Sequence, residues 1–283
     1  MAEILNGKAV SNTLRTSIKA EVSTMKQKGI IPGLAVILIG DDPASRIYVN
    51  NKKKACTEVG FHSEEYNLAS STTQQELLNL IETLNKKKQI NGILVQLPLP
   101  NHLDAKEVIE AIDPQKDVDA FHAQNVGKIM MGEYQFLPCT PSGIMELLHA
   151  ENIDVRGKHC VVIGRSNIVG KPMAMLMLHE DATVTICHSK TKNLAEICKT
   201  ADILVAAVGC AKFVQKDMVK PGAVVVDVGM NRDENGKLCG DVDFNQVEKL
   251  ASFITPVPGG VGPMTIAMLL KNTLTAAKLQ NHI

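Results

Sequence analysis

The sequence predicts an α/β protein of two domains, the second built on a doubly wound parallel sheet, with a cleft between them. Three observations lead to this prediction. The 283 residues match two domains at the usual ~150 residues each. Hydrophobic residues make up 45% of the chain, which is enough for packed cores. Short apolar segments alternate with helix-like segments, an order typical of parallel sheets covered by helices.

Buried strands are expected wherever β-branched and apolar residues follow one another without alternation, because such strands are covered on both faces. These segments are Leu34–Gly40, Gly92–Leu99, His159–Gly164, Thr183–His188, Ile203–Gly209 and Val224–Gly229. Helices are expected between them, for example over Gln74–Lys86 and Leu194–Thr200.

The domain boundary is expected between Asp113 and Pro141, a stretch rich in proline and glycine. Residues 1–120 then form the first domain and residues 121–262 the second. The final helix, 263–283, could pack on either domain and is assigned to complete the first.

Composition limits the classes of partner. Lys+Arg and Asp+Glu both total 30, which argues against a broad nucleic-acid-binding surface. The seven cysteines are scattered without metal-ligand spacing, so they predict free thiols in a reducing compartment and no metal site.

No apolar stretch is long enough to span a bilayer, and the first residues do not resemble a secretion signal. A cytoplasmic protein without nucleic-acid or membrane partners is expected.

A dinucleotide site is predicted where the strand His159–Gly164 leads into a helix. Glycine at such a turn lets the backbone approach a pyrophosphate, and the helix N-terminus supplies free N–H groups. The turn Gly164-Arg165-Ser166 departs from the usual GxGxxG pattern because Ser166 replaces the second glycine and Gly170 comes later. Alone, this motif is only a weak indication of a Rossmann-like domain.

The next strand favours NADP over NAD. A fold that prefers NAD usually carries Asp or Glu about 20 residues after the first glycine. The strand here ends in His188-Ser189-Lys190-Thr191, without a carboxylate. Arg165, Ser189 and Lys190 suit a 2′-phosphate. A solvated polar turn would be the simpler interpretation without the preceding glycine turn, but the two segments together favour NADP. Met230, which directly follows the predicted strand Val224–Gly229, is expected at the same edge of the sheet.

A lysine on an otherwise uncharged helical stripe is the first candidate for catalysis. Asp42-Pro43 is typical of a helix start. On the helix that follows, one stripe holds Ala44, Tyr48, Lys52, Ala55 and Val59. Lys53 and Lys54 rotate away from this stripe. A structural lysine whose stem covers apolar surface is the alternative for Lys52.

Three other segments carry polar or glycine-rich signals, each with a structural alternative. Gln96 interrupts an apolar strand and needs hydrogen-bond partners there. Asp117 and Asp119 lie close to the expected boundary, where carboxylates commonly face water. The loop Thr255–Thr265 is dense in glycine and proline before an apolar helix, so it can approach a ligand closely or simply begin the helix.

Taken together, these segments resemble the bifunctional methylenetetrahydrofolate dehydrogenase/methenyltetrahydrofolate cyclohydrolase family, in order over essentially the whole chain. The matching motifs are Ser45-x-x-Tyr48-Val49-x-x-Lys52, Val95-Gln96-Leu97-Pro98, Lys116-Asp117-Val118-Asp119, Pro138-Cys139-Thr140-Pro141, Gly164-Arg165-Ser166-x-x-Val169-Gly170-x-Pro172, His188-Ser189-Lys190-Thr191 and Pro258-Gly259-Gly260-Val261-Gly262-Pro263-Met264-Thr265. Ala120 departs from the family, which usually has Gly there.

The resemblance implies a role for each candidate residue. Lys52 would be the catalytic lysine, held by Gln96. Tyr48 would pack on the aminobenzoyl ring, and Asp119 would bind the pterin. The remaining folate contacts would come from Val95, Leu97, Pro258, Gly259, Gly260, Val261 and Gly262. NADP would be bound by Gly164, Arg165, Ser166, Ser189 and Met230.

The implied activity has two steps. NADP oxidises 5,10-methylene-tetrahydrofolate to the 5,10-methenyl form, and hydrolysis then gives 10-formyl-tetrahydrofolate. Two alternatives remain open: an NADP-dependent dehydrogenase of another small substrate without hydrolase activity, and a non-catalytic NADP-binding module. The family also implies a homodimer, which nothing in the residues themselves indicates.

Overall fold

The computed structural model describes all 283 residues, apart from the side chain of Ala44, and divides into two compact units. The three-stranded unit consists of residues 12–139 and 266–283, and the six-stranded unit consists of residues 1–11 and 140–265. The units separate at Cys139 and Thr140, inside the stretch Asp113–Pro141 where the sequence places the boundary, although beyond the assigned limit of residue 120. The first residues join the six-stranded unit, where β1 pairs with β11.

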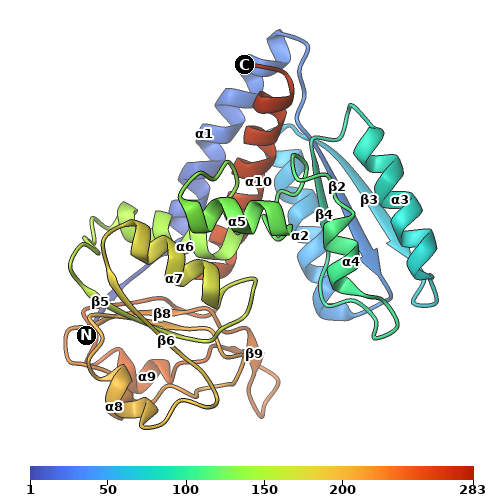
Figure 1. Cartoon of the computed structure of the whole chain (residues 1–283). Helices are drawn as coiled ribbons and strands as arrows, with labels where there is room; N and C mark the ends of the chain where they lie inside the picture. Colours follow the sequence, from blue (N-terminus) through green and yellow to red (C-terminus); the bar gives the residue numbers. More distant parts are fainter. The chain divides into compact units, whose positions relative to one another are not determined.

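The three-stranded unit holds a parallel sheet in the order β3-β2-β4. Its strands are β2 (Gly33–Ile39), β3 (His62–Leu68) and β4 (Gly92–Val95). Its helices are α1 (Gly7–Gln27), which begins in the other unit, α2 (Pro43–Val59), α3 (Gln74–Lys86), α4 (Ala105–Glu110), α5 (Ala123–Met131) and the end of α10 (Val261–Gln280). Figure 1 shows α2 on one side of this sheet and α3 with α4 on the other.

The central strand β2 is buried on both faces. Ala35, Ile37 and Ile39 pack with the apolar residues of α3 and α4 in one cluster. The alternate residues Leu34 and Val36 point to the opposite face, as successive strand residues must, and are 0% and 2% exposed. The all-apolar composition that predicts this strand therefore has its cause in two-sided packing.

The six-stranded unit holds an entirely parallel sheet in the order β1-β11-β8-β7-β5-β6. Its strands are β1 (Glu3–Ile4), β5 (His159–Ile163), β6 (Thr183–Cys187), β7 (Ile203–Ala206), β8 (Val224–Asp227) and β11 (Phe253–Ile254). A short antiparallel hairpin of β9 (Asn231–Arg232) and β10 (Leu238–Cys239) lies outside this sheet. The connecting helices are α6 (Cys139–Ala150), α7 (Gly170–His179), α8 (Leu194–Cys198), η1 (Lys216–Met218) and α9 (Phe244–Val247).

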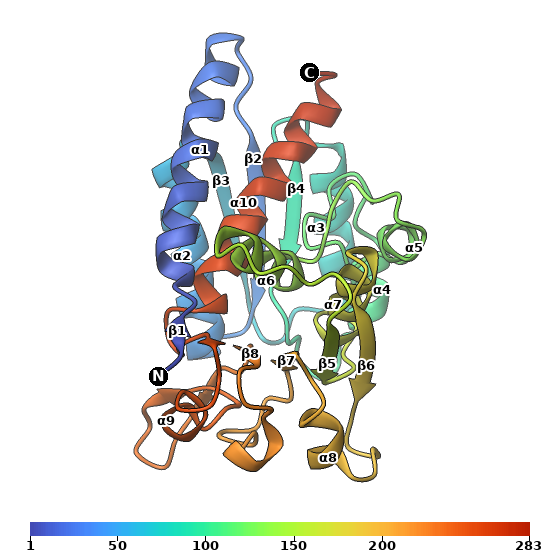
Figure 2. The same ribbon diagram turned by 90° about the vertical axis from the view of Figure 1, so that its left-hand side faces the viewer.

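Helices cover both faces of this sheet: α6 and α7 lie on one face, and α8 and α9 on the other (Figures 1 and 2). The chain runs from β5 to β6 on one side and then returns to β7 on the other side of β5. Ligands of such folds bind at this point, at the carboxyl ends of the strands. The predicted doubly wound sheet is confirmed.

Buried Lys116 shows how a motif residue can serve the fold. Its Nζ donates hydrogen bonds to the carbonyl oxygens of Leu84 (3.0 Å) and Lys87 (2.9 Å), at the C-terminus of α3. Burial lowers the pKa of Lys116, and the Asp113 charge opposes this shift. A cation at a helix C-terminus interacts favourably with the carbonyl groups and the dipole there.

We expect Lys116→Met to lower the free energy of unfolding by about 2 kcal/mol, because two hydrogen bonds from a charged donor to backbone carbonyl groups are lost. Thermal or urea unfolding of the purified variant measures this change. Lys88→Met, which removes an exposed lysine from the same turn, is the matched control. Equal stability of the two variants would contradict the capping role.

Among the described residues, no helix is long and apolar enough to cross a membrane. In the same part of the chain, no group of three or more His, Cys, Asp or Glu side chains is arranged to hold a metal ion.

Candidate active site

Helix α2 carries the candidate lysine. The Asp42 carboxylate accepts a hydrogen bond from the backbone N–H of Ser45 (2.7 Å) and caps the helix, with Pro43 in its first turn. Lys52 is only 8% exposed, whereas Lys53 and Lys54 are exposed. The predicted inward stripe agrees with this arrangement, except that the side chain of Ala44 lies outside the described residues.

Lys52 contacts the strand amide directly. Its Nζ donates a hydrogen bond of 2.8 Å to Oε1 of Gln96, 44 residues later in the chain. Gln96 lies just beyond β4, where its backbone N–H still bonds to Ile37 (2.9 Å). Its own Nε2 donates to the carbonyl oxygen of Leu97 (2.8 Å). Both ends of the amide are therefore engaged, and its oxygen is fixed toward the lysine.

Asp119 and two thiols complete the surroundings of the amine. The Sγ of Cys139 lies 3.5 Å from Oδ1 of Asp119 and 3.5 Å from the carbonyl oxygen of Val118. Asn272 of α10 donates to that same carbonyl from Nδ2 (2.8 Å). The loop bearing Asp119 is thus tied to the C-terminal helix, within the three-stranded unit.

The electrostatics of this cluster favour uncharged groups. Burial lowers the pKa of Lys52, while the Asp119 charge acts in the opposite direction. Burial also raises the pKa of Asp119 and raises that of the Cys139 thiol well above its usual value. The Cys56 thiol, one helical turn from Lys52, has a pKa raised to about 11 by burial. Both thiols therefore remain protonated at neutral pH, and the amine can lose its proton more readily than a solvated lysine.

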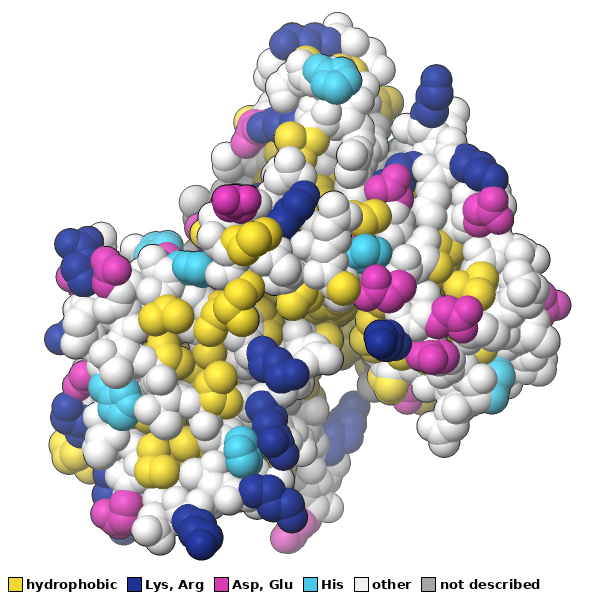
Figure 3. All heavy atoms as spheres, in the orientation of Figure 1, with side chains coloured by type: hydrophobic (Ala, Val, Ile, Leu, Met, Phe, Trp, Pro, Cys, Tyr) yellow, Lys and Arg dark blue, Asp and Glu magenta, His cyan; other side chains and the backbone are white. Residues whose placement is uncertain are grey.

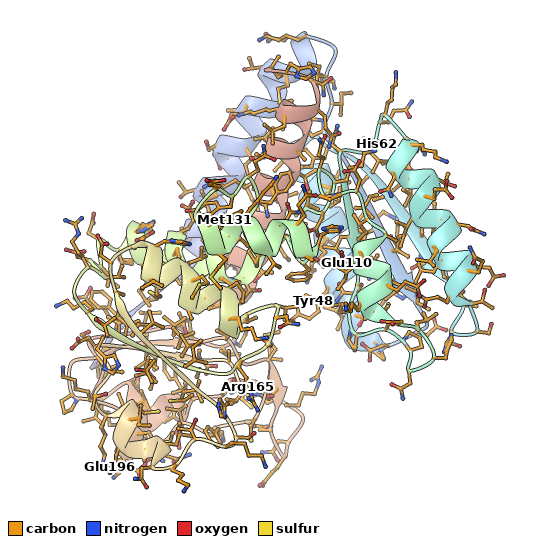
Figure 4. The ribbon with its side chains drawn as sticks, viewed as in Figure 1. Tyr48, His62, Glu110, Met131, Arg165 and Glu196 are labelled. Atoms are coloured by element: carbon orange, nitrogen blue, oxygen red, sulfur yellow. The ribbon has the colours of Figure 1, made fainter. Side chains whose placement is uncertain are left out.

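Tyr48 lies one turn before Lys52 on α2 and is half-buried. Figure 4 shows its side chain at the edge of the three-stranded unit, extending away from the helix. Burial raises the pKa of its phenol, so the ring is neutral and offers an apolar face with a hydroxyl tip. Of the other predicted folate contacts in this unit, Val95 is 6% exposed and Leu97 is half-buried.

Asp117 serves the structure around the site. Its Oδ2 accepts hydrogen bonds from the backbone N–H of His122 (2.8 Å) and from Nδ2 of Asn125 (2.8 Å). Ala120, where the resembling family usually has Gly, is fully buried with φ 58°. This left-handed conformation explains why glycine suits the position and shows that the turn tolerates alanine at some cost in strain.

The turn after β5 is shaped for close approach of a ligand. Gly164 has φ 130°, and a Cβ there would lie 2.3 Å from the carbonyl oxygen of Ala207. A Cβ on Gly170 would lie 2.2 Å from the carbonyl oxygen of Gly164. The Ser166 hydroxyl accepts from the backbone N–H groups of Val169 (3.1 Å) and Gly170 (3.3 Å). The serine hydroxyl therefore stabilises the turn that leads into α7, whose N-cap residue is Val169.

The remaining dinucleotide candidates lie at the same sheet edge. Ser189 follows β6, which pairs with β5 so that Cys187 lies opposite Ile163. Arg165 and Lys190 are exposed, and Met230 after β8 is 46% exposed. Figure 3 shows Lys and Arg side chains gathered on one face of the six-stranded unit, and Figure 4 shows Arg165 reaching outward from its turn.

The loop Pro258–Gly262 belongs to the six-stranded unit and leads into α10. It packs on the start of α1: Gly259 accepts a hydrogen bond from the backbone N–H of Lys8 (3.0 Å), and a Cβ on Gly7 would lie 1.8 Å from the Gly260 carbonyl oxygen. Within the loop, a Cβ on Gly260 would lie 2.7 Å from the carbonyl oxygen of Pro256, so backbone packing also requires this glycine. A Cβ on Gly262 would meet nothing within 4 Å.

The structure thus brings together Lys52, Gln96 and Asp119 in one unit and the turns bearing Arg165 and Ser189 in the other. Sequence reasoning did not single out Asn272 or Cys56, nor the buried pair Asp227 and Asp241. Cys139 was noticed only as part of a motif. Of these residues, Asp227 carries the clearest local signal, as a carboxylate inside the apolar segment Val224–Gly229.

Two sequence models of one protein family match the two parts of the chain. The sequence model described as "Tetrahydrofolate dehydrogenase/cyclohydrolase, catalytic domain" matches residues 5–119. The model described as "Tetrahydrofolate dehydrogenase/cyclohydrolase, NAD(P)-binding domain" matches residues 138–281. The bifunctional protein FolD of Acetivibrio thermocellus is 62% identical over 279 residues, covering 99% of this chain and 98% of the relative.

Solved structures agree with this match. The bifunctional FolD enzyme of Campylobacter jejuni superposes with a TM-score of 0.97 at 52% identity, with 100% of both chains covered. The Trypanosoma brucei dehydrogenase-cyclohydrolase, described as complexed with NADP cofactor and an inhibitor, has a TM-score of 0.96 at 40% identity, covering 100% of this chain and 99% of that one. The predicted enzyme class, with an NAD(P)-binding domain, is confirmed. The chain belongs to the tetrahydrofolate dehydrogenase/cyclohydrolase family.

Proposed function

We propose that this chain oxidises 5,10-methylene-tetrahydrofolate with NADP and hydrolyses the 5,10-methenyl product to 10-formyl-tetrahydrofolate. The observation that carries the proposal is the buried Lys52 amine, bonded to Gln96 and facing the charge of Asp119. The three-stranded unit is the folate-binding catalytic part, completed by the end of α10, and the six-stranded unit binds NADP.

Lys52 is assigned the proton transfer in the hydrolytic step. A methenyl cation repels an ammonium group, and burial already lowers the pKa of Lys52, so substrate binding favours the neutral amine. The neutral amine accepts a proton from the attacking water as general base. Gln96 holds the amine on one side of the site and restricts its rotation.

Asp119 and Tyr48 are assigned to substrate binding. A carboxylate accepts two parallel N–H bonds from the guanidine-like edge of a pterin. The half-buried Tyr48 ring supplies an apolar face for the aminobenzoyl group. Val95, Leu97 and the loop Pro258–Gly262 are assigned to the folate on the family resemblance alone.

The six-stranded unit fits NADP. The pyrophosphate would be held at the Gly164–Ser166 turn and the N-terminus of α7, where added Cβ atoms would collide with backbone. Arg165, Ser189 and Lys190 suit the 2′-phosphate, and Met230 offers exposed apolar surface. When bound, the cofactor accepts hydride from the methylene bridge, and the protein contributes positioning.

A coupled assay tests this function. Wild-type protein is given methylene-tetrahydrofolate with NADP or NAD, and the methenyl and formyl products are followed separately. We expect both products with NADP. Methenyl product that accumulates without enzymatic hydrolysis would favour a dehydrogenase of one activity, and no turnover despite NADP binding would favour a binding module.

Arg165→Ala is expected to weaken NADP binding about 10-fold while changing NAD binding little, because a charged contact to the 2′-phosphate is lost. Calorimetric titration with each dinucleotide measures both dissociation constants. Lys192→Ala, which removes another exposed lysine from the loop after β6, is the control. Equal losses for NADP and NAD in Arg165→Ala would remove the argument for 2′-phosphate recognition.

We also infer a homodimer in the cytoplasm. Strand β6 is an edge of the six-stranded sheet, and Ile186 on it and Leu178 on α7 are 39% and 52% exposed. Exposed apolar residues beside an open sheet edge suit pairing with a second copy. All seven cysteines are free thiols in the described structure, which suits a reducing compartment. Sedimentation of the wild type and of Ile186→Lys tests dimerisation, since a charge at this edge should dissociate the dimer.

A further inference from the structure

Two buried carboxylates lie near the carboxyl edge of the six-stranded sheet, and no step proposed above uses them. Asp241 is 0% exposed and Asp227, at the end of β8, is 3% exposed. Burying a carboxylate is costly unless hydrogen bonds compensate it. The partners of these two groups therefore indicate what the burial accomplishes.

Asp241 binds the loop that follows β7. Its Oδ2 accepts hydrogen bonds from the backbone N–H groups of Val208 (2.7 Å) and Gly209 (3.0 Å), and its Oδ1 accepts from that of Cys210 (2.9 Å). Asn231 adds a fourth donor through Nδ2 (2.8 Å). One carboxylate thus fixes three consecutive peptide groups and the start of β9.

Asp227 fixes the backbone that carries Asp241. Its Oδ1 accepts from the backbone N–H groups of Asp241 (2.8 Å) and Gly229 (2.9 Å), and its Oδ2 accepts from that of Val242 (2.9 Å). There is no room for a side chain between these parts, because a Cβ on Gly240 would lie 1.8 Å from Oδ2 of Asp227. The two carboxylates act in series, from the end of β8 to the loop after β7.

This loop adjoins the dinucleotide turn. Ala207, directly before Val208, presents the carbonyl oxygen that a Cβ on Gly164 would approach to 2.3 Å. Val208 is 36% exposed, and a Cβ on Gly209 would meet nothing within 4 Å, so the far side of the loop is open. The N–H groups of residues 208–210 are all directed to Asp241, so the ends of β7 and β8 offer the cofactor shape and apolar surface and not N–H donors.

We propose that Asp241 is a positioning residue for the dinucleotide reaction, holding residues 208–210 in the conformation that the cofactor requires beside the Gly164 turn. Its oxygens are occupied by four protein donors, so it acts through the loop and not by touching the cofactor. The proposal rests on the proposed function of the six-stranded unit. It adds a residue that neither the dinucleotide motif nor the folate cluster contains.

Asp241→Asn is the direct test, because the amide keeps the size of the side chain but replaces one acceptor with a donor facing N–H groups. We expect the dissociation constant for NADP to rise by about 10- to 100-fold, the range for loss of a charged acceptor. Hydrolysis of methenyl-tetrahydrofolate supplied directly needs no hydride transfer and should persist. Asp243→Asn, two residues away and bonded to Gln246 on α9, is the matched control and should leave NADP binding unchanged.

Two further measurements keep the test decisive if Asp241→Asn folds poorly. Asn231→Ala removes one donor and should weaken NADP binding in the same direction but less. Hydrogen exchange in Asp241→Asn should accelerate at residues 208–210 before the β5 amides. Unchanged NADP binding in a folded Asp241→Asn variant would overturn the proposal, as would an equal loss of both activities. A wild-type protein that does not bind NADP would instead refute the proposed function.

Discussion

Replacing Lys52 with methionine is expected to slow methenyl-tetrahydrofolate hydrolysis by about 10³-fold, within the range attributed to a general base. Methionine fills nearly the same buried volume next to Gln96 but cannot accept a proton. NADP binding should persist, because the dinucleotide residues belong to the other unit. Stopped-flow measurement of methenyl decay in wild type and variant gives the ratio.

Lys54→Met is the matched control, since Lys54 is exposed on the same helix and its loss should change the hydrolysis rate less than about twofold. Ordinary hydrolytic turnover by Lys52→Met would refute the role of the amine. In the wild type, the rate should rise with pH as Lys52 loses its proton, and this rise should begin below the usual lysine range because burial lowers its pKa.

Lys52→Met is expected to reduce activity but not the stability of the fold. The folded-state pKa of Lys52 lies below its unfolded value, so the unfolded chain binds more protons in the window between the two values. The contribution of Lys52 to stability is therefore present above the unfolded pKa and is lost as the pH falls through the folded one. Below the unfolded pKa, burial of this amine therefore costs free energy, so Lys52→Met should unfold at the same or a higher temperature than the wild type at neutral pH.

Asp119→Asn has the second largest expected effect. The dissociation constant for the folate substrate should rise by about 10²-fold, because an amide cannot replace a carboxylate that accepts two charge-assisted bonds. Calorimetric titration with methenyl- or formyl-tetrahydrofolate measures this change. Asp41→Asn, an exposed carboxylate at the start of α2, is the control, and folate binding by Asp119→Asn at wild-type strength would exclude Asp119 from substrate recognition.

The sequence predicts well the strands that are buried on both faces. It also locates β6, but the expectation that this strand is buried on both faces is wrong, because β6 is a partly exposed edge strand. The strands β2, β5, β7 and β8 are largely apolar because helices cover both sides of their sheets. Strand β3 could not be found in this way, since it is an edge strand whose Glu64 and Glu65 pair with Lys87 and Lys53. Two-residue strands such as β1 and β11 have no periodicity to detect.

The candidate site was predictable only in its local parts. Helical spacing alone turns Lys52 inward and Lys53 outward, as the structure has them. The partnership of Lys52 with Gln96 joins residues 44 positions apart, and that of Asn272 with Val118 spans 154. Such contacts follow from tertiary packing, so the sequence pointed to them through family resemblance or not at all.

The central claim is that the Lys52 amine is turned inward, held by Gln96 within reach of the Asp119 charge. Its protonation can be followed directly by NMR titration of protein labelled with ¹³C,¹⁵N-lysine, with the Lys52 signal assigned by its loss in Lys52→Met. We expect a pKa below the ordinary lysine value of about 10.4, and a still lower value in Asp119→Asn. A Lys52 signal that titrates at or above the ordinary value, and that Asp119→Asn leaves unchanged, would contradict the account.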